Sequence, residues 1–194
     1  MESAMRTTTE TSRTSAVADP AALPHGVALR GLVAHVDGRG RVGEIFRAEW
    51  PTGVAPVQWV MSFSEAGVMR GVHAHIRHDD YFVLLDGRLV LGLRDLRAGS
   101  PTGERSALLE LRGDMPVAVS IPHGVAHGFL FLAPSTYVLG STHYYDADDE
   151  LGCHWQDPGL GLDWPLSSAL LSPRDAALPP LRELAARMPP WRAG

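Results

Sequence analysis

Short runs of apolar or alternating residues, bounded by glycine, proline and aspartate, follow one another along the chain from Gly31 onward. The clearest runs cover residues 57–62, 81–85, 88–95, 117–121, 129–132 and 137–141. Between two of them lies Asp86-Gly87, a dipeptide typical of tight hairpin turns. Many short strands at this spacing predict an all-β fold, either a sandwich or a barrel.

The two ends of the chain depart from this pattern. Residues 1–20 are rich in Thr, Ser and Ala without periodicity, so we expect a disordered N-terminal tail. Near the other end, Leu181, Leu184 and Met188 fall on one helical face after a pair of prolines and predict a short helix. We expect residues 21–194 to form a single domain.

Composition narrows the class of protein. Of 194 residues 45% are hydrophobic, but no apolar run could span a membrane, so we expect a cytoplasmic protein. All 17 basic residues are arginine, which excludes chemistry that needs a lysine Schiff base or a P-loop lysine. A net charge of −5 without a basic cluster argues against a nucleic-acid partner. The single cysteine, Cys153, excludes an intrachain disulfide framework, and we expect it to be a small buried residue.

Histidines gather in two stretches of the chain. His73 and His75 stand two residues apart, so on a β-strand their imidazoles lie on the same face. Asp80 follows shortly after, and His127 belongs to a second stretch that also predicts a strand. A small barrel could direct all four side chains into one interior, where they would suit proton transfer or the binding of a metal ion.

The same residues resemble the two sequence motifs of the cupin superfamily. The first motif, G-x5-H-x-H-x3-4-E-x6-G, is matched, with aspartate in place of glutamate, by Gly67, His73, His75, Asp80 and Gly87. The second motif, P-x-G-x2-H, is matched by Pro122, Gly124 and His127. This resemblance implies an all-β cupin jelly-roll barrel or sandwich, here with a short C-terminal helical segment.

Further segments occur in a recognisable order along most of the chain. They cover residues 37–40 with Glu44, then 67–73, 95–102, 121–129, 144–146, 155–165 and 172–175. Together they are similar to the dTDP-4-dehydrorhamnose 3,5-epimerase family. In that family a histidine and an aspartate remove a proton next to the 4-keto group of a nucleotide-linked sugar, and a tyrosine acts as acid on the opposite face. No metal or other cofactor takes part.

The resemblance implies that His73 is the base and Asp175 its orienting partner, a sound pairing because imidazole is a suitable base near neutral pH. Contacts to the substrate are implied for Arg39, Glu44, Gln58, Arg70, His75 and His127. Arg70 would lie near the developing enolate or the diphosphate, and Arg39 would reach the diphosphate across a dimer interface. We therefore expect a homodimeric epimerase acting at C3, C5 or both of a dTDP-4-keto-6-deoxyhexose, in deoxysugar or secondary-metabolite synthesis.

The chain also departs from the family pattern. The position of the acid tyrosine falls on Leu139, which cannot donate a proton, so Tyr137, two residues earlier on the same strand face, is the candidate substitute. A lysine near the diphosphate is replaced by Asp80, and an asparagine near the nucleotide by Val60. An anion beside a phosphate is unfavourable, so the ligand could differ from an ordinary dTDP-sugar.

Other functions remain open at this point. His73, His75, Asp80 and His127 form an alternative ligand set for a divalent transition metal, as in a metal-dependent cupin oxygenase or cyclase. The His-Ala-His triplet also resembles the sugar-nucleotide 3,4-ketoisomerases, which use the same substrate class. A catalytically dead binding protein is a third alternative, although the retention of His73 and Asp175 argues against it. We expect His78 in a loop or at the surface.

Overall fold

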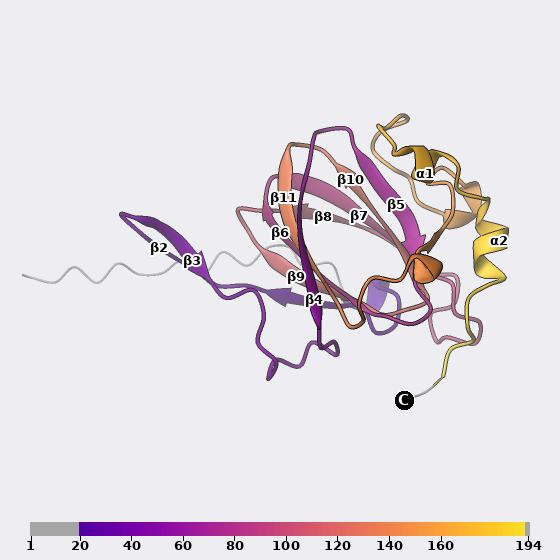
Figure 1. Cartoon of the computed structure of the whole chain (residues 1–194), viewed down its shortest axis with the longest axis horizontal. Coiled ribbons are helices and arrows are strands. Elements are labelled where there is room, and N and C mark those ends of the chain that lie inside the picture. The colour runs from indigo at the N-terminus through magenta and orange to yellow at the C-terminus, as the bar shows by residue number, and fades with distance from the viewer. Residues whose placement is uncertain (1–19, 193–194) are drawn as a thin grey trace, which may run out of the picture.

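The computed structural model describes residues 20–192, and nearly all of their regular structure is β-strand (Figure 1). The first sheet has the order β1-β9-β6-β11-β4, with bounds Ala28–Gly31, Val117–Ile121, Asp80–Asp86, Ser135–Ser141 and Gln58–Ser64. The second has the order β12-β5-β10-β7-β8, with bounds Leu151–Gly152, Met69–Ala74, Val125–Phe131, Arg88–Asp95 and Ser106–Arg112. Neighbouring strands in both sheets are antiparallel.

The two sheets pack face to face around one apolar core. Phe82 of β6 in the first sheet stacks on Phe129 of β10 in the second, with ring centroids 4.4 Å apart. Buried leucines of β7 and β8 complete the layer, together with Val119 and Ile121 of β9 and Val125 of β10. Burying each large apolar side chain stabilises the fold by about 1.5–3 kcal/mol. The all-β jelly-roll expectation is confirmed.

A second apolar cluster lies on the outer face of the second sheet. Val72 and Ala74, which alternate with His73 along β5, pack there against the C-terminal part of the chain. Cys153 is buried in this cluster as expected, and burial raises the pKa of its thiol to about 12. Of the two short helices on this side, α1 (Pro173–Ala176) lies against β5 and α2 (Leu181–Ala185) against β12 (Figure 1). This covering segment brings Asp175 to the strand that carries His73.

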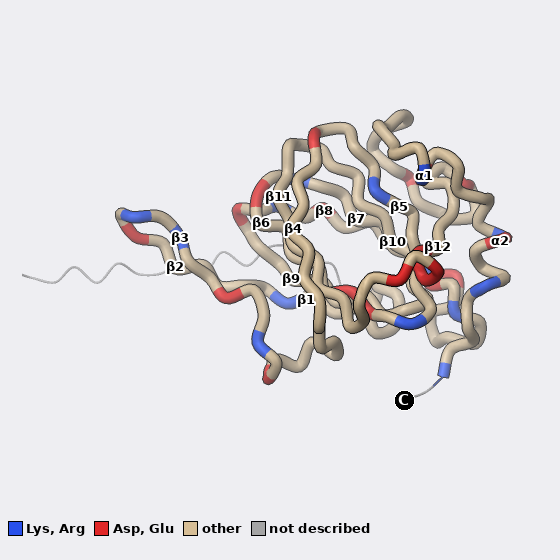
Figure 2. Tube along the Cα trace, viewed as in Figure 1, with Lys and Arg blue, Asp and Glu red and all other residues tan. Residues whose placement is uncertain are grey.

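A two-stranded hairpin, β2 (Ala34–Asp37) and β3 (Gly40–Gly43), projects from one side of the barrel (Figure 1). Basic and acidic residues lie together at its tip, where Arg39 donates to the carboxylate of Asp37 (Figure 2). After the hairpin, the carbonyl of Ile45 accepts a hydrogen bond from the Tyr81 hydroxyl at 2.8 Å. The hairpin therefore extends from the first sheet, away from the C-terminal helices.

The predicted strands are present, with small shifts in their ends. The predicted strand at residues 129–132 is part of the longer β10, and the predicted terminal helix is the five-residue α2. Strands β1 to β3, β8 and β12, the short helix α1, and the 3₁₀ turns Pro20–Ala22, Ala147–Asp149 and Pro158–Leu160 were not predicted. The predicted tail, residues 1–20, lies outside the described residues except for Pro20. Among residues 20–192, no helix is both long and apolar enough to cross a lipid bilayer.

Candidate functional site

A cavity of about 520 Å³ lies between the two sheets. Its walls come from β4, β6 and β11 on one side and from β5 and β10 on the other, and residues 170–175 close it at the C-terminal end. The inward face of each strand supplies its lining. Since side chains alternate along a strand, the pattern that puts Val72 and Ala74 outside turns His73 into the cavity.

At the edge of this cavity, His73 and Asp175 form a hydrogen-bonded pair. His73 Nε2 lies 2.8 Å from Asp175 Oδ1, and the two side chains are 19% and 7% exposed. The Ser172 hydroxyl caps helix α1 by accepting a hydrogen bond from the Asp175 backbone amide at 3.0 Å. Burial opposes ionisation of Asp175, but the hydrogen bond and charge of His73, together with the Gly71 amide and Arg174, outweigh it and lower the pKa of this carboxyl. Asp175 is therefore ionised near neutral pH and can only accept.

This pairing fixes the tautomer of His73. An ionised carboxylate is an acceptor, so Nε2 must carry the hydrogen that it donates to Asp175. The neutral ring then has its lone pair on Nδ1. His73 is thus arranged as a base whose free nitrogen is Nδ1, with a carboxylate placed to stabilise the imidazolium that forms.

Deeper in the cavity, the carboxylate of Asp80 is surrounded by imidazoles. Its Oδ2 lies 3.4 Å from His75 Nε2 and 3.3 Å from His127 Nε2, while Oδ1 lies 3.6 Å from His78 Nε2. All four side chains are buried. Burial would lower the pKa of His75, but Asp80 and the backbone carbonyl of Asp149 raise it to about 9. For His127, burial lowers the pKa to about 4.

Arginines lie at the rim of the cavity. Arg70 of β5 donates from Nε to the Ser64 hydroxyl at 2.8 Å and from Nη2 to the carbonyl of Phe63 at 3.3 Å. Arg174 of α1 donates from Nη2 to the carbonyl of Glu150 at 2.7 Å. Both side chains line the cavity, which gives its rim two fixed positive charges. Such a rim suits an anionic group on a ligand.

The sequence profile of the family described as dTDP-4-dehydrorhamnose 3,5-epimerase matches residues 23–183. The chain belongs to this family. The match includes the strands of both sheets and the helix that carries Asp175, so it extends over the whole cavity.

Individual relatives agree with the family profile. The chain is 36% identical over 152 residues to a dTDP-4-dehydrorhamnose 3,5-epimerase of Neisseria gonorrhoeae, an alignment that covers 73% of this chain but only 45% of that protein. A Legionella pneumophila dTDP-6-deoxy-D-glucose-3,5-epimerase, solved with dTDP-4-keto-L-rhamnose, is similar with a TM-score of 0.80 and 32% identity, over 87% of this chain and 95% of that one. A 3'-monoepimerase of Streptomyces bikiniensis, solved with dTDP-quinovose, has a TM-score of 0.79 and 29% identity, over 86% and 90%.

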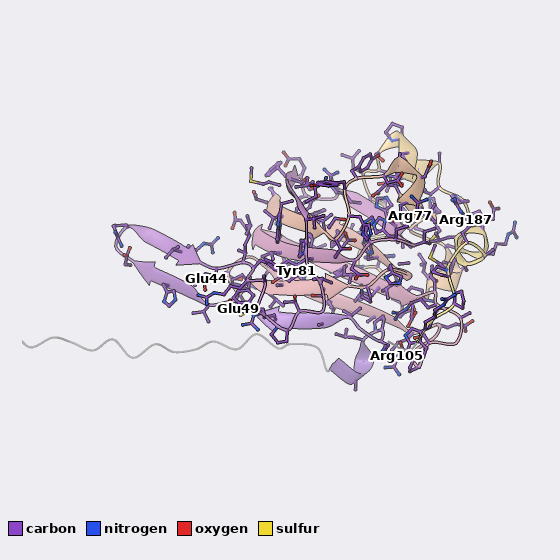
Figure 3. The ribbon with its side chains drawn as sticks, turned by 60° about the horizontal axis from the view of Figure 1, so that its bottom comes forward. Glu44, Glu49, Arg77, Tyr81, Arg105 and Arg187 are labelled. Atoms are coloured by element: carbon purple, nitrogen blue, oxygen red, sulfur yellow. The ribbon has the colours of Figure 1, made fainter. Side chains whose placement is uncertain are left out.

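Most residues that the epimerase resemblance singled out come together in the cavity. Its lining includes His73, Asp175, Tyr137, Gln58, Arg70, His75 and His127. The amide oxygen of Gln58 accepts a hydrogen bond from the backbone amide of Tyr145 at 2.8 Å, which holds the Gln58 side chain in place. Two predicted contact residues lie elsewhere in the same chain. Arg39 is exposed at the hairpin tip, and Glu44 pairs with Arg47 at the hairpin base (Figure 3).

The wall that carries the acid tyrosine in the epimerase family is formed here by β11. Leu139 and Tyr137 both face the cavity. The Tyr137 ring is also part of the core, with Phe82 and Phe131 each 5.3 Å away between ring centroids. Val60 of β4 pairs with Leu139 across the strands, so this part of the wall is apolar.

One expectation from the sequence needs a correction. His78 lies in the loop between β5 and β6, as expected, but it is buried rather than at the surface, and its Nδ1 lies 2.8 Å from Asp149 Oδ2. Asp80, which stands where the epimerase resemblance has a lysine, points into the interior toward His75 and His127, and its side chain is 2% exposed. Residues 75–79, where the resemblance to the epimerases is poor, form the short connection between β5 and β6. His123 is exposed, and it pairs with Asp79.

The structure also adds residues that the sequence reasoning did not single out. Glu150, Tyr145 and Arg174 line the cavity, and Asp149 holds His78 behind it. Asp149 and Glu150 lie in an acidic stretch, Asp146 to Glu150, whose composition resembles an ordinary solvated turn. The sequence offered no other signal that this turn folds back onto the histidine cluster.

Proposed function

We propose that this protein is an epimerase that acts on a dTDP-4-keto-6-deoxyhexose. The observation that carries the proposal is the pair formed by His73 and Asp175 at the cavity wall, with Nε2 and Oδ1 2.8 Å apart. The functions of the similar structures, a 3,5-epimerase and a 3'-monoepimerase, support this class of substrate. Deoxysugar synthesis is the corresponding metabolic role.

In the proposed reaction His73 removes the proton from the carbon next to the 4-keto group. The C–H bond breaks, its proton passes to Nδ1, and the electron pair moves into the enolate on the keto oxygen. Asp175 stabilises the resulting imidazolium through the Nε2–H hydrogen bond. Return of a proton to the opposite face of the carbon completes the inversion.

The rim arginines support a nucleotide-linked substrate. Arg70 and Arg174 provide two guanidinium groups in the same cavity as the base, in a chain whose net charge is −5. Guanidinium groups bind phosphate oxygens through paired hydrogen bonds. The diphosphate would lie at the rim, with the sugar ring beside His73. Gln58 from β4 is placed to contact the nucleotide.

Because Leu139 cannot donate a proton, Tyr137 is the proposed acid on the β11 wall. The two residues face the same cavity from positions two apart on one strand. A phenol displaced along the strand cannot serve both reacting carbons equally. We therefore infer slow epimerisation, mainly at one centre.

A homodimer in the cytoplasm completes the proposal. Trp59, Met61 and Phe63 alternate along the edge strand β4 and are 40%, 74% and 54% exposed, so they form an apolar stripe next to the hairpin. A second copy of the chain covering this stripe would remove it from water. The projecting hairpin would then carry Arg39 toward the partner's cavity. The single cysteine is compatible with a reducing compartment.

Proton exchange on a defined substrate tests the proposal. The protein is incubated with dTDP-4-keto-6-deoxyglucose in deuterated water, and NMR follows deuterium at C3 and C5 together with the configuration of each carbon. We expect exchange in the wild type and none in His73→Ala. Appearance of the 3-keto isomer would identify a ketoisomerase instead. Absence of exchange on this and related dTDP-4-keto-sugars would refute the assignment.

A further inference from the structure

Asp80 has an unusual environment for a buried carboxylate. Its side chain is 2% exposed, and neither carboxylate oxygen has a hydrogen-bond partner among the described residues. A carboxylate removed from water normally accepts several hydrogen bonds or pairs with a cation. Here the nearest groups are ring nitrogens of His75 and His127, which lie 3.4 and 3.3 Å from Oδ2. These separations exceed the usual 2.7–3.2 Å of an N–H···O hydrogen bond.

The hydrogen bonds of Nδ1 in His75 and His127 determine which tautomer each ring adopts when neutral, and so whether Nε2 faces Asp80 with a hydrogen or a lone pair. His75 Nδ1 lies 3.0 Å from the carbonyl of Asp149, and His127 Nδ1 lies 3.2 Å from the carbonyl of Val125. A carbonyl oxygen only accepts, so each Nδ1 carries a hydrogen. Without an ion, Asp80 keeps a second proton on His75, because it raises the pKa of that ring to about 9, so Nε2 of His75 carries a hydrogen. A metal ion would displace this proton, since ligating imidazoles are neutral, and the Nε2 atoms of His75 and His127 would then each present a lone pair beside Asp80 Oδ2. Three donor atoms would thus converge on one ion.

The spacing of the three atoms fits coordination of a metal ion. Bonds of about 2.0–2.1 Å with tetrahedral angles place ligand atoms roughly 3.3–3.4 Å apart. The two measured separations from Asp80 Oδ2 are 3.4 and 3.3 Å, and all three candidate ligand atoms lie within 4.8 Å of one another. Backbone carbonyls that hold the far nitrogens of ligating histidines are a recurrent feature of metal sites.

We propose that His75 Nε2, Asp80 Oδ2 and His127 Nε2 bind a divalent transition-metal ion. Two imidazoles and one carboxylate suit Zn²⁺, Fe²⁺, Mn²⁺ or Ni²⁺ better than Mg²⁺ or Ca²⁺, which prefer oxygen ligands. All three residues line the cavity, so the remaining coordination positions face a ligand bound there. A metal at this point could polarise an oxygen of that ligand.

This ligand set differs from the four residues that the sequence suggested. His73 is not among the three proposed ligands: its Nε2 is held by Asp175 at 2.8 Å, and its ring does not join the group of ligand atoms that lie within 4.8 Å of one another. His78 faces the other oxygen, Asp80 Oδ1, at 3.6 Å and is held from behind by Asp149. The metal site is independent of the proposed epimerase activity, since it can be measured without substrate.

Metal content tests the site directly. The wild type and each variant are purified without chelator, stripped, and dialysed separately against Zn²⁺ and Co²⁺, and bound metal per chain is then measured. We expect about one ion per chain in the wild type and a Co²⁺ visible spectrum typical of nitrogen and oxygen ligands. Asp80→Asn and His127→Gln should each lose both signals. His75→Gln gives a third measurement if one of these variants does not fold.

Two control variants make the test specific. His73→Ala should keep the metal because it leaves all three ligands in place, even though it removes the proposed base. His123→Gln should also keep it, since His123 is an exposed histidine paired with Asp79. A wild type that binds no more metal than Asp80→Asn would overturn the site. Loss of metal in His73→Ala would overturn this ligand set in favour of one that includes His73.

Discussion

The imidazole of His73 on β5 donates a hydrogen bond to the carboxylate of Asp175 on α1 at 2.8 Å, although 102 residues separate them in the chain. The carboxylate fixes the ring so that Nδ1 is the free base. In the proposed reaction, other residues of the cavity would anchor the substrate or determine where a proton returns. Each part can be tested separately.

Asp175→Asn should reduce proton exchange by roughly 10²–10⁴-fold, because an amide can hydrogen-bond either tautomer and does not stabilise the imidazolium. Deuterium incorporation at C3 and C5, measured by NMR, gives the rate. Asp163→Asn is the matched control, since Asp163 is an exposed aspartate of the same C-terminal segment. If Asp175→Asn exchanged at the wild-type rate, the dyad would have no role.

Tyr137→Phe should reduce inversion more than deuterium exchange, by roughly 10²–10⁴-fold if the phenol is the acid. Exchange without inversion remains possible because His73 can return the proton to the face from which it came. The ratio of inverted to exchanged product distinguishes the two steps. Tyr144→Phe, at a tyrosine that is 76% exposed, should change neither.

Leu139→Tyr should increase inversion, since it restores a phenol at the position that carries the acid in the family. A gain at a second carbon would show that this residue limits the reaction to one centre. The larger side chain costs about 1–3 kcal/mol if the cavity cannot accommodate it. A variant that folds, binds the nucleotide sugar and gains no inversion would argue against this function for the β11 wall.

Asp95 should make stability depend on pH. Burial opposes its ionisation, but Arg97, Ser100 and Thr102 outweigh this and lower its pKa below the ordinary 3.8. This stabilisation is present above that ordinary value and is lost as pH falls through the lower folded pKa. Asp95→Asn should therefore destabilise the protein by roughly 3 kcal/mol near pH 7 and by less in strong acid. Urea unfolding at several pH values measures this, with Asp114→Asn, at a surface ion pair, as control.

Gly71→Ala should destabilise the protein and disturb the dyad. A Cβ at Gly71, where φ is +117°, would lie 2.8 Å from both the Cα of Gly128 and the carbonyl oxygen of His127. The strands would have to separate beside His73. Gly99→Ala is a matched control because φ is +82° there but no atom lies within 4 Å. A loss of about 2 kcal/mol or more beyond the control is expected, measured as the free energy of unfolding.

The sequence predicted a strand well where both the residue types and the alternation of apolar residues favour β-structure. Val117–Ile121 and Arg88–Asp95 were predicted with their observed ends. Strand β8 was missed because Ala, Leu, Glu and Arg favour helices, although Leu109 and Leu111 alternate with exposed residues. The hairpin was missed because its strands lack a buried face, so no apolar alternation marks them.

By itself the sequence determined the jelly-roll class, the inward direction of His73 and, by resemblance, the residues of a base and its partner. Each of these follows from a period of two along a strand or from the order of short motifs. Only the tertiary structure decided which groups meet. The carboxylate at His73 is one of 22 acidic residues, and it arrives there because an apolar C-terminal segment packs on the outside of the second sheet. Likewise, the turn bearing Asp149 folds back to hold His78, so the surroundings of Asp80 depend on long-range packing that no local pattern encodes.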